Sequence, residues 1–424
     1  KGSIKVIAAD GVDVEPFKID RLLIAIAETY DLLLEVPADG SYELRATAQD
    51  GSGYASYFIG DGENRLASSP PMPNLYVMEH HDSHGSHKMK SMPMSHNKHH
   101  AHRKPPMKKM PPDPRPQAPY ESLRAVEKTK LNSRSRWREV HLNLTGDMNR
   151  YLWTFNGKTL KEEDRIKIRK GENVRFILKN KTMMHHPIHL HGHFFRVVNQ
   201  HGDYSPWKHT VDVPHQTVTI EFAATEEKDW FFHCHVLYHM KSGMSRIVSY
   251  EDSPVDPDIA SMRHKLFQDP IYAWGRTKVL SQMSEGQLQL SNTRNDLIAT
   301  WEADWKGEYE VEGTYNRYFN RFVSAFGGAL SNDEATYGIF GVKALLPLLI
   351  EARAWVNTRG HGRFMLEKEQ SLFPRLIAFG NVEYDTEIKW EWHAGAEFML
   401  CRWASLVGQY HSEFGPGGGL EIRF

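Results

Sequence analysis

Residues 233–235 read His-Cys-His, and an upstream stretch at residues 186–192 reads His-Pro-Ile-His-Leu-His-Gly. In a β-strand, successive side chains point to opposite faces. His233 and His235 therefore share one face, and Cys234 points to the other. His189 and His191 share a face in the same way. One strand can thus serve two metal sites, and the Cys–His peptide links form a short covalent path for electrons between them.

The thiol of Cys234 needs partners to hold a metal. His239 and Met244 lie just beyond it, where a loop that leaves the strand would place ligands, and His186 can add a second imidazole. Two His and one Cys in a trigonal site, with a distant axial Met, form the blue-copper pattern. Coordination removes the proton of the thiol and tunes the Cu(II)/Cu(I) potential. The sequence therefore predicts a copper site at Cys234.

Two other interpretations of these residues compete with a copper site. A buried His is usually a core residue with its hydrogen bonds satisfied, but that interpretation would have to explain six His, one Cys and one Met at two regular spacings. Zinc also binds Cys and His. The long His-Cys-His run with a distal Met favours copper over zinc.

The two stretches resemble the C-terminal signatures of multicopper oxidases, H-x-x-H-x-H-G and H-C-H-x3-H-x4-M. The resemblance implies type 1 copper ligands at His186, Cys234, His239 and Met244. It implies a type 2 ligand at His189 and type 3 ligands at His191, His233 and His235. It also gives Cys234, His233 and His235 the catalytic role of relaying electrons.

The family's trinuclear copper cluster is held by four H-x-H pairs. Two of them match residues 189/191 and 233/235, and we expect the other two in a cupredoxin domain upstream that this chain lacks. The implied activity is oxidation of Cu(I), or of another one-electron donor, with reduction of O2. The alternative is a non-enzymatic periplasmic protein that binds and sequesters copper, anchored by or working with an outer-membrane barrel.

Residues 71–125 are dominated by Pro, Lys, His and Met, as in the bacterial copper-resistance subfamily that the chain resembles. With so few large apolar residues, this segment cannot bury a core, and we expect a disordered linker. Thioether sulfur suits Cu(I) and imidazole suits Cu(II), so the linker can add copper binding. The candidate ligands are His80, His81, His84, His87, Met89, Met92, Met94, His96, His99, His100, His102, Met107 and Met110.

The predicted fold class is all-β. Residues 126–253 contain short strands separated by Gly and Pro turns, such as 174–178 and 216–222, which is typical of a β-sandwich. By the resemblance, this is the C-terminal copper-binding cupredoxin domain with Greek-key connections, and residues 1–70 are the C-terminal part of another cupredoxin-like domain. Residues 254–295 are expected to be a connector, so that disordered linkers join the folded parts.

Residues 296–424 show alternating polarity in segments of roughly ten residues, such as 350–357 and 420–424, with frequent aromatic residues. A soluble antiparallel sheet with one wet face gives the same alternation. We favour an antiparallel outer-membrane-type β-barrel of about eight strands, the smallest usual closed size. Stretches 383–387 and 410–412 resemble outer-membrane copper-resistance proteins, and Cys401 is interpreted as structural.

Net charge and hydropathy limit the kinds of partner that this chain can have. With 52 basic and 53 acidic residues, no overall field favours nucleic acid. No apolar run approaches the roughly 18–20 residues of a spanning helix, so a membrane segment would have to be a barrel. We expect Cu(I)/Cu(II) ions, O2 and the outer membrane as partners, and the periplasm or outer membrane of a Gram-negative bacterium as the location.

Overall fold

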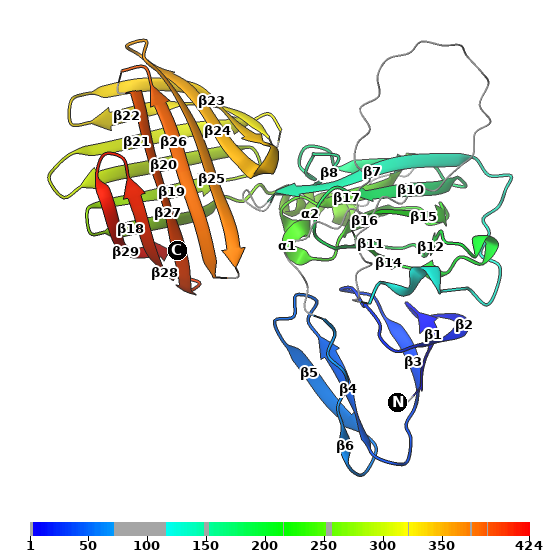
Figure 1. Cartoon of the computed structure of the whole chain (residues 1–424). Coiled ribbons are helices and arrows are strands. Elements are labelled where there is room, and N and C mark those ends of the chain that lie inside the picture. Colours follow the sequence, from blue (N-terminus) through cyan, green and yellow to red (C-terminus); the bar gives the residue numbers. More distant parts are fainter. Residues whose placement is uncertain are drawn as a thin grey trace, which may run out of the picture. The chain divides into compact units, whose positions relative to one another are not determined.

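A computed structural model describes residues 3–71, 116–147, 152–214, 216–251, 257–320, 322–373, 375–387 and 389–424. The described chain is almost entirely β-structure, so the all-β prediction is confirmed (Figure 1). It divides into two compact units, Lys1–Thr145 with Trp153–Arg263, and Gly146–Leu152 with His264–Phe424. The short helical elements are α1 (Leu237–Lys241), α2 (Pro257–Leu266), η1 (Pro119–Glu121), η2 (Gly202–Tyr204) and η3 (Pro347–Leu349). Across the described ranges, no helix has the length and apolar character needed to cross a membrane.

Two small antiparallel or mixed sheets occupy the first part of unit 1. The first has the order β2-β1-β3, and its strands are β1 (Ser3–Ala9), β2 (Val12–Ile19) and β3 (Tyr30–Glu35). The second has the order β5-β4-β6, and its strands are β4 (Ser41–Thr47), β5 (Tyr54–Ile59) and β6 (Asn64–Arg65). Asp10 and Gly11 take positive φ angles of 50° and 76° in the tight turn between β1 and β2, as the Asp-Gly pair favours.

Two larger sheets form the β-sandwich. One has the order β13-β12-β15-β10-β7-β8, with β7 (Trp137–Asp147), β8 (Leu152–Phe155), β10 (Asn173–Asn180), β12 (Phe195–Val197), β13 (Trp207–Lys208) and β15 (Thr217–Ala223). The other has the order β14-β11-β16-β17-β9, with β9 (Arg165–Ile168), β11 (His186–Leu190), β14 (Thr210–Val213), β16 (Asp229–Cys234) and β17 (Ser245–Tyr250).

A shared apolar core joins these two sheets. Phe176 on β10 lies 5.4 Å from Phe222 in its own sheet and 5.2 Å from Phe232 in the facing sheet, between ring centroids. Alternate residues of each strand are buried there, and Cys234 and Met244 belong to the same cluster. The predicted copper ligands Cys234 and Met244 therefore lie within a well-packed interior.

Part of the expected linker is ordered. Residues 72–115, which carry the His and Met residues predicted to bind copper, lie outside the described residues. Residues 116–125, however, pack against the sandwich, with Tyr120 and Leu123 buried. The Asn199 side chain donates hydrogen bonds to the carbonyls of both residues at 2.7 Å. The prediction of disorder was wrong for this end because Tyr120 and Leu123 supply apolar surface that the core accepts.

Unit 2 contains a closed antiparallel barrel of twelve strands, so the prediction of about eight was wrong. The barrel begins at Tyr272, inside residues 254–295, which were expected to be a connector. That prediction was wrong here because the strands β18 and β19 pair with each other through a two-residue turn before residue 296. The strands are β18 (Tyr272–Leu280), β19 (Met283–Ser291), β20 (Asn295–Asp304), β21 (Tyr309–Tyr318), β22 (Val323–Asn332), β23 (Thr336–Leu346), β24 (Ile350–Asn357), β25 (Gly362–Phe373), β26 (Leu376–Asp385), β27 (Lys389–Cys401), β28 (Ala404–His411) and β29 (Gly415–Arg423).

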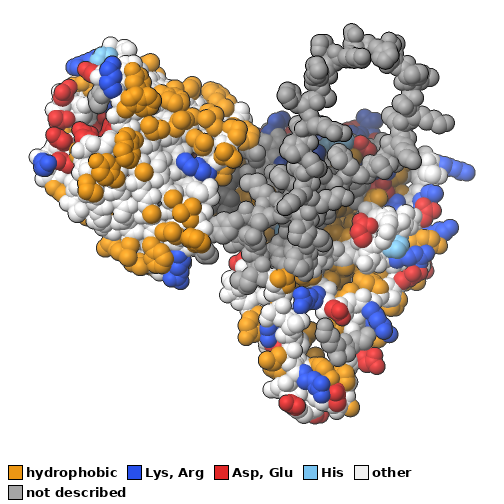
Figure 2. All heavy atoms as spheres, in the orientation of Figure 1, with side chains coloured by type: hydrophobic (Ala, Val, Ile, Leu, Met, Phe, Trp, Pro, Cys, Tyr) orange, Lys and Arg blue, Asp and Glu red, His pale blue; other side chains and the backbone are white. Residues whose placement is uncertain are grey.

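The barrel wall has an apolar outer face, and its inner face carries many polar side chains beside two smaller apolar clusters around Phe326 and Met283. On β28, Ser405 and Gln409 are buried while Leu406 and Tyr410 are exposed. Large apolar side chains cover much of the visible outer surface of the barrel (Figure 2). This is the reverse of a water-soluble core, in which apolar side chains would point inward.

Candidate copper centre

Strands β11 and β16 bring the two predicted motifs together. They pair antiparallel, with Ile188 opposite Cys234 and His189 opposite His233. Because faces alternate along each strand, His186 and Cys234 lie on one side of this pair. His189 and His233 lie on the other side. The alternation in the sequence thus divides the predicted ligands into two clusters.

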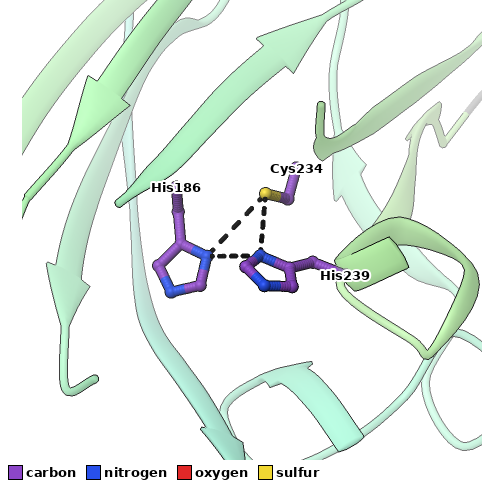
Figure 3. A group of neighbouring side chains, drawn as sticks. All are labelled: His186, Cys234 and His239. Atoms are coloured by element: carbon purple, nitrogen blue, oxygen red, sulfur yellow. Dashed lines mark hydrogen bonds between the residues drawn. The ribbon is translucent and has the colours of Figure 1, made fainter. Parts of the chain in front are cut away.

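The first cluster consists of His186, Cys234 and His239, all of them buried (Figure 3). Sγ of Cys234 lies 3.7 Å from Nδ1 of His186 and 3.6 Å from Nδ1 of His239. The two Nδ1 atoms are 3.1 Å apart. One sulfur and two nitrogen atoms therefore converge on one point, as a trigonal metal site requires.

The remaining predicted ligand, Met244, lies in the turn just after helix α1, which carries His239. Met244 is fully buried. Its N–H donates to the His239 carbonyl at 2.9 Å, and its own carbonyl accepts from the Cys234 N–H at 3.0 Å. These bonds fix the loop between His239 and Met244 against the end of β16.

Burial sets the protonation of this cluster. It lowers the pKa of His186 to about 3, helped by the nearby His239 and His185, and it lowers the pKa of His239 to about 4. Burial also raises the pKa of the Cys234 thiol to about 12. Both imidazoles are therefore neutral with lone pairs available, and a soft metal that displaces the thiol proton fits this donor set.

Two neighbours orient these ligands. The indole of Trp153 on β8 packs on the His239 ring, with centroids 4.0 Å apart. The Thr182 hydroxyl is 2.8 Å from Nε2 of His186, which leaves Nδ1 facing the sulfur. Sequence reasoning missed both residues, because nothing in their local sequence marks them as neighbours of a site assembled from distant strands.

The second cluster contains the four His predicted to bind type 2 and type 3 copper. Nε2 of His191 lies 3.2 Å from Nε2 of His233. Ring centroids are 5.9 Å apart for His189 and His235 and 5.4 Å apart for His233 and His235. The structure thus brings together four imidazoles from β11, β16 and the residues just after them.

Hydrogen bonds orient these rings for ligation. Nδ1 of His189 donates to the His209 carbonyl at 2.8 Å, and Nδ1 of His233 donates to the Cys234 carbonyl at 3.0 Å. Both rings then keep an Nε2 lone pair, and burial lowers the pKa of each to about 4. Nδ1 of His235 is buried with no hydrogen-bond partner in the described part of the chain. A buried ring nitrogen without a partner, among three other imidazoles, fits a metal ligand.

Two residues just after β11, Gly192 and His193, have a structural task. Gly192 has φ +68°, and a Cβ there would lie 2.3 Å from the Trp230 ring. His193 extends the H-x-H spacing by one more step, but its ring bonds to the His191 carbonyl at 3.1 Å and to the Tyr250 hydroxyl at 2.9 Å. His193 therefore holds the backbone at His191 rather than joining the cluster.

A buried charged group lies behind the second cluster, and sequence reasoning did not find it. Lys208 is fully buried, with Nζ 3.2 Å from Asp10 and 3.3 Å from Glu28. Asp10 also accepts the backbone N–H groups of His209 and Thr210 at 3.0 and 3.1 Å. Since the His209 carbonyl accepts the hydrogen bond from His189, Asp10 in the turn after β1 helps to hold His189 in place.

Comparisons with known proteins agree with this geometry. Residues 2–64 and 134–254 each match a family model described as "Multicopper oxidase". A copper resistance protein A homolog of Pseudomonas syringae pv. tomato is 31% identical over 299 residues, which cover 58% of this chain and 50% of that protein. Copper resistance protein A of Escherichia coli is 31% identical over 314 residues, covering 58% and 52%. The chain thus spans about half the length of the curated relatives it matches.

Among solved structures, a laccase from Botrytis aclada is 17% identical with a TM-score of 0.41, covering 63% of this chain and 51% of that one. A multicopper oxidase from Aquifex aeolicus is 19% identical with a TM-score of 0.36, covering 58% and 49%. The similarity of this chain to a known family therefore rests on the sequence matches and not on these solved structures. Over residues 2–64 and 134–254, the chain is similar to the multicopper oxidases, a family that uses copper cofactors, among them a type 1 site.

Proposed function

We propose that this chain works as a copper-dependent oxidoreductase of copper resistance, which oxidises Cu(I) or another one-electron donor and passes the electrons to O2. The observation that carries the proposal is the placement of one Cys between two His at the end of β16, with Cys234 in one ligand cluster and His233 and His235 in the other. Bound copper would supply one-electron transfer at the Cys234 cluster and reduction of O2 to water at the His cluster.

The chain's own residues hold and link the two clusters. Cys234 is joined to each neighbouring His by one peptide bond, so the two ligand sets share a covalent route only a few bonds long. The buried sandwich core excludes water from the thiol side. Two further H-x-H pairs are needed for a full trinuclear cluster, and we propose that another cupredoxin domain supplies them.

Two Met residues just before His186 can serve as soft ligands for a Cu(I) substrate. Met183 and Met184 precede His186 and are 53% and 37% exposed, which does not fit plain core packing. Thioether sulfur binds Cu(I) well. The names of the relatives, copper resistance protein A, also favour copper as the substrate.

The first test is the visible absorption spectrum of the copper-loaded chain, with Cys234→Ser as the matched control. We expect an intense blue band that the variant lacks, and oxygen uptake on addition of Cu(I) by the complete protein that the variant abolishes. A blue band without any Cys234-dependent oxygen uptake would mean that the chain stores copper and does not oxidise it. Oxidase activity that survives in Cys234→Ser would overturn the proposal.

We also propose that the barrel sits in the outer membrane of a Gram-negative bacterium, which would place the copper-binding unit in the periplasm. Its support is the wall itself, with exposed Leu288, Leu406 and Leu420 outside and polar side chains inside. Extraction tests this directly: the chain should leave isolated membranes only with detergent. A chain that stays in solution without detergent would contradict this location.

A further inference from the structure

A group of His and Glu side chains inside the barrel has no part in the proposed oxidase. It comprises Glu302 on β20, Glu391 and His393 on β27, and His411 on β28. Ligand atoms of Glu302, His393 and His411 all lie within 4.8 Å of one another, and Glu391 shares His411 in a second such group with Glu413. His393 and His411 are opposite each other on paired strands, with ring centroids 5.8 Å apart.

These residues meet across the interior of the barrel. Strands β20 and β28 are separated by β29, β18 and β19 along the closed wall. Even so, Nε2 of His411 lies only 3.6 Å from the Glu302 carboxylate and 3.5 Å from the Glu391 carboxylate. The His411 side chain is 1% exposed, whereas those of Glu302 and Glu391 are 40% and 30% exposed. A small ion could therefore reach the group from the carboxylate side.

The charge around this group is unbalanced. Ten other carboxylates on the barrel strands form an ion pair with Lys or Arg: Glu285 with Lys278, Glu351 with Lys343, Glu312 with Arg353, Glu367 and Glu369 with Arg276, Glu310, Glu383 and Asp385 with Arg363, and Glu397 and Glu421 with Arg423. Among the described residues, Glu302 and Glu391 pair only with His411. One imidazole cannot neutralise two carboxylates, so the group favours an added cation.

The spacing of the donor atoms fits a shared ion better than direct hydrogen bonds. Separations of 3.5 and 3.6 Å exceed the usual range of about 2.7–3.2 Å for N–H···O bonds. Ligands at about 2.0–2.2 Å from a tetrahedral metal lie about 3.4 Å from one another.

From this geometry we propose that Glu302, Glu391, His393 and His411 form a binding site for a divalent transition-metal ion inside the barrel. Two imidazoles with two carboxylates suit ions such as Cu2+ and Zn2+, with Cu2+ bound more tightly. The site is separate from the ligands around Cys234 and does not depend on the oxidase activity.

The test compares metal binding by the purified full chain with that of two variants, His393→Gln and Glu302→Gln. The matched control is His361→Gln, because His361 also pairs with a barrel Glu, Glu387, at 2.6 Å but lies outside the group. Each protein is stripped with a chelator, loaded with Zn2+, desalted and measured by elemental analysis. Other sites in the chain contribute equally to all four proteins, so the difference isolates the barrel site.

The wild type and His361→Gln should each retain one more equivalent of Zn2+ than His393→Gln and Glu302→Gln. With Cu2+, the electron paramagnetic resonance difference between wild type and His393→Gln should show imidazole nitrogen coupling. Equal metal content in all four proteins would overturn the proposal. Glu302→Gln is nearly isosteric, so circular dichroism should show an intact barrel in that variant. The blue band at Cys234 should stay unchanged, which separates this outcome from a failure of the proposed oxidase.

Discussion

At the scale of single residues, the Cys234 thiol couples copper binding to one proton. Burial raises its pKa to about 12, while His186 and His239, with pKa values near 3 and 4, are already neutral above about pH 5. Copper must therefore displace one proton, from the thiol, at any pH between about 5 and 11. The affinity for Cu(II) at this site should rise about tenfold per pH unit in that window.

This pH dependence can be measured by competition with a chelator of known affinity, followed through the blue band from pH 5.5 to 8. If the Cys234→Ser variant still binds copper through its imidazoles, its copper affinity should not rise with pH in this way, because no thiol proton has to leave. An affinity of the wild type that stays flat over this range would mean that the thiolate already exists in the metal-free protein.

Trp153 supports the same site through packing. It is almost fully buried and lies against His239 at 4.0 Å. Trp153→Ala would leave a large cavity and should lower the free energy of unfolding by about 3–5 kcal/mol. Trp153→Phe should cost much less, since Nε1 of Trp153 has no hydrogen-bond partner among the described residues and the ring face is kept.

Urea unfolding of the copper-loaded chain, followed by loss of the blue band, measures both Trp153 variants. If alanine costs no more than phenylalanine, the indole does not pack as the structure shows.

At the scale of elements, the turn between β1 and β2 is tied to β13 and β14 by a buried ion pair. Lys208 balances Asp10 and Glu28, and all three side chains have no exposed surface. Lys208→Met would leave two buried carboxylates without a cation, and losing one partner of a buried pair costs about 3–5 kcal/mol. The free energy of unfolding of unit 1 should fall by that order.

A double-mutant cycle with Asp10→Asn checks this ion pair. The double variant should be less destabilised than the sum of the two single variants, because each change removes part of the other's penalty. Strict additivity would show that Lys208 and Asp10 do not interact.

The sequence predicted those parts of the molecule that depend on local spacing. The alternation at 233–235 and 186–192 was enough to divide the ligands between two faces, and β11 and β16 place them so. It could not reveal Trp153, Thr182 or Lys208, since their roles come from contacts across the sandwich. The predicted number of barrel strands was wrong for two reasons. The strands Tyr272–Leu280 and Met283–Ser291 lie in the segment expected to be a connector, and the residues after them form ten strands because the loops between those strands are only two to four residues long.

At the scale of the whole molecule, two units bury their side chains in opposite ways. Unit 1 has apolar residues inside, with Phe176, Phe222 and Phe232 in contact between its sheets. The barrel has ion pairs such as Lys278–Glu285 inside, beside a smaller apolar cluster around Phe326 and Trp355, and most of its large apolar side chains lie outside. A single solvent cannot favour both arrangements, because exposed apolar wall surface is unfavourable in water. The outer-membrane proposal resolves this contrast by giving the barrel a lipid environment.

The outer wall offers a decisive substitution. Leu288 lies in the middle of β19 and is 44% exposed, between the inward-facing Gln287 and Gln289. In water, changing an exposed Leu to Arg usually alters stability by no more than about 0.5 kcal/mol. On a lipid-facing wall near the midplane, Arg costs about 2–4 kcal/mol. Leu288→Arg should therefore destabilise the barrel by that amount in lipid vesicles, measured by urea unfolding.

Leu288→Ala is the matched control, because it removes the same side chain without adding charge. If Leu288→Arg is no more destabilising in vesicles than Leu288→Ala, the wall does not face lipid. The apolar outer surface would then need a protein partner, because so much exposed apolar area around a closed barrel would otherwise drive association in water.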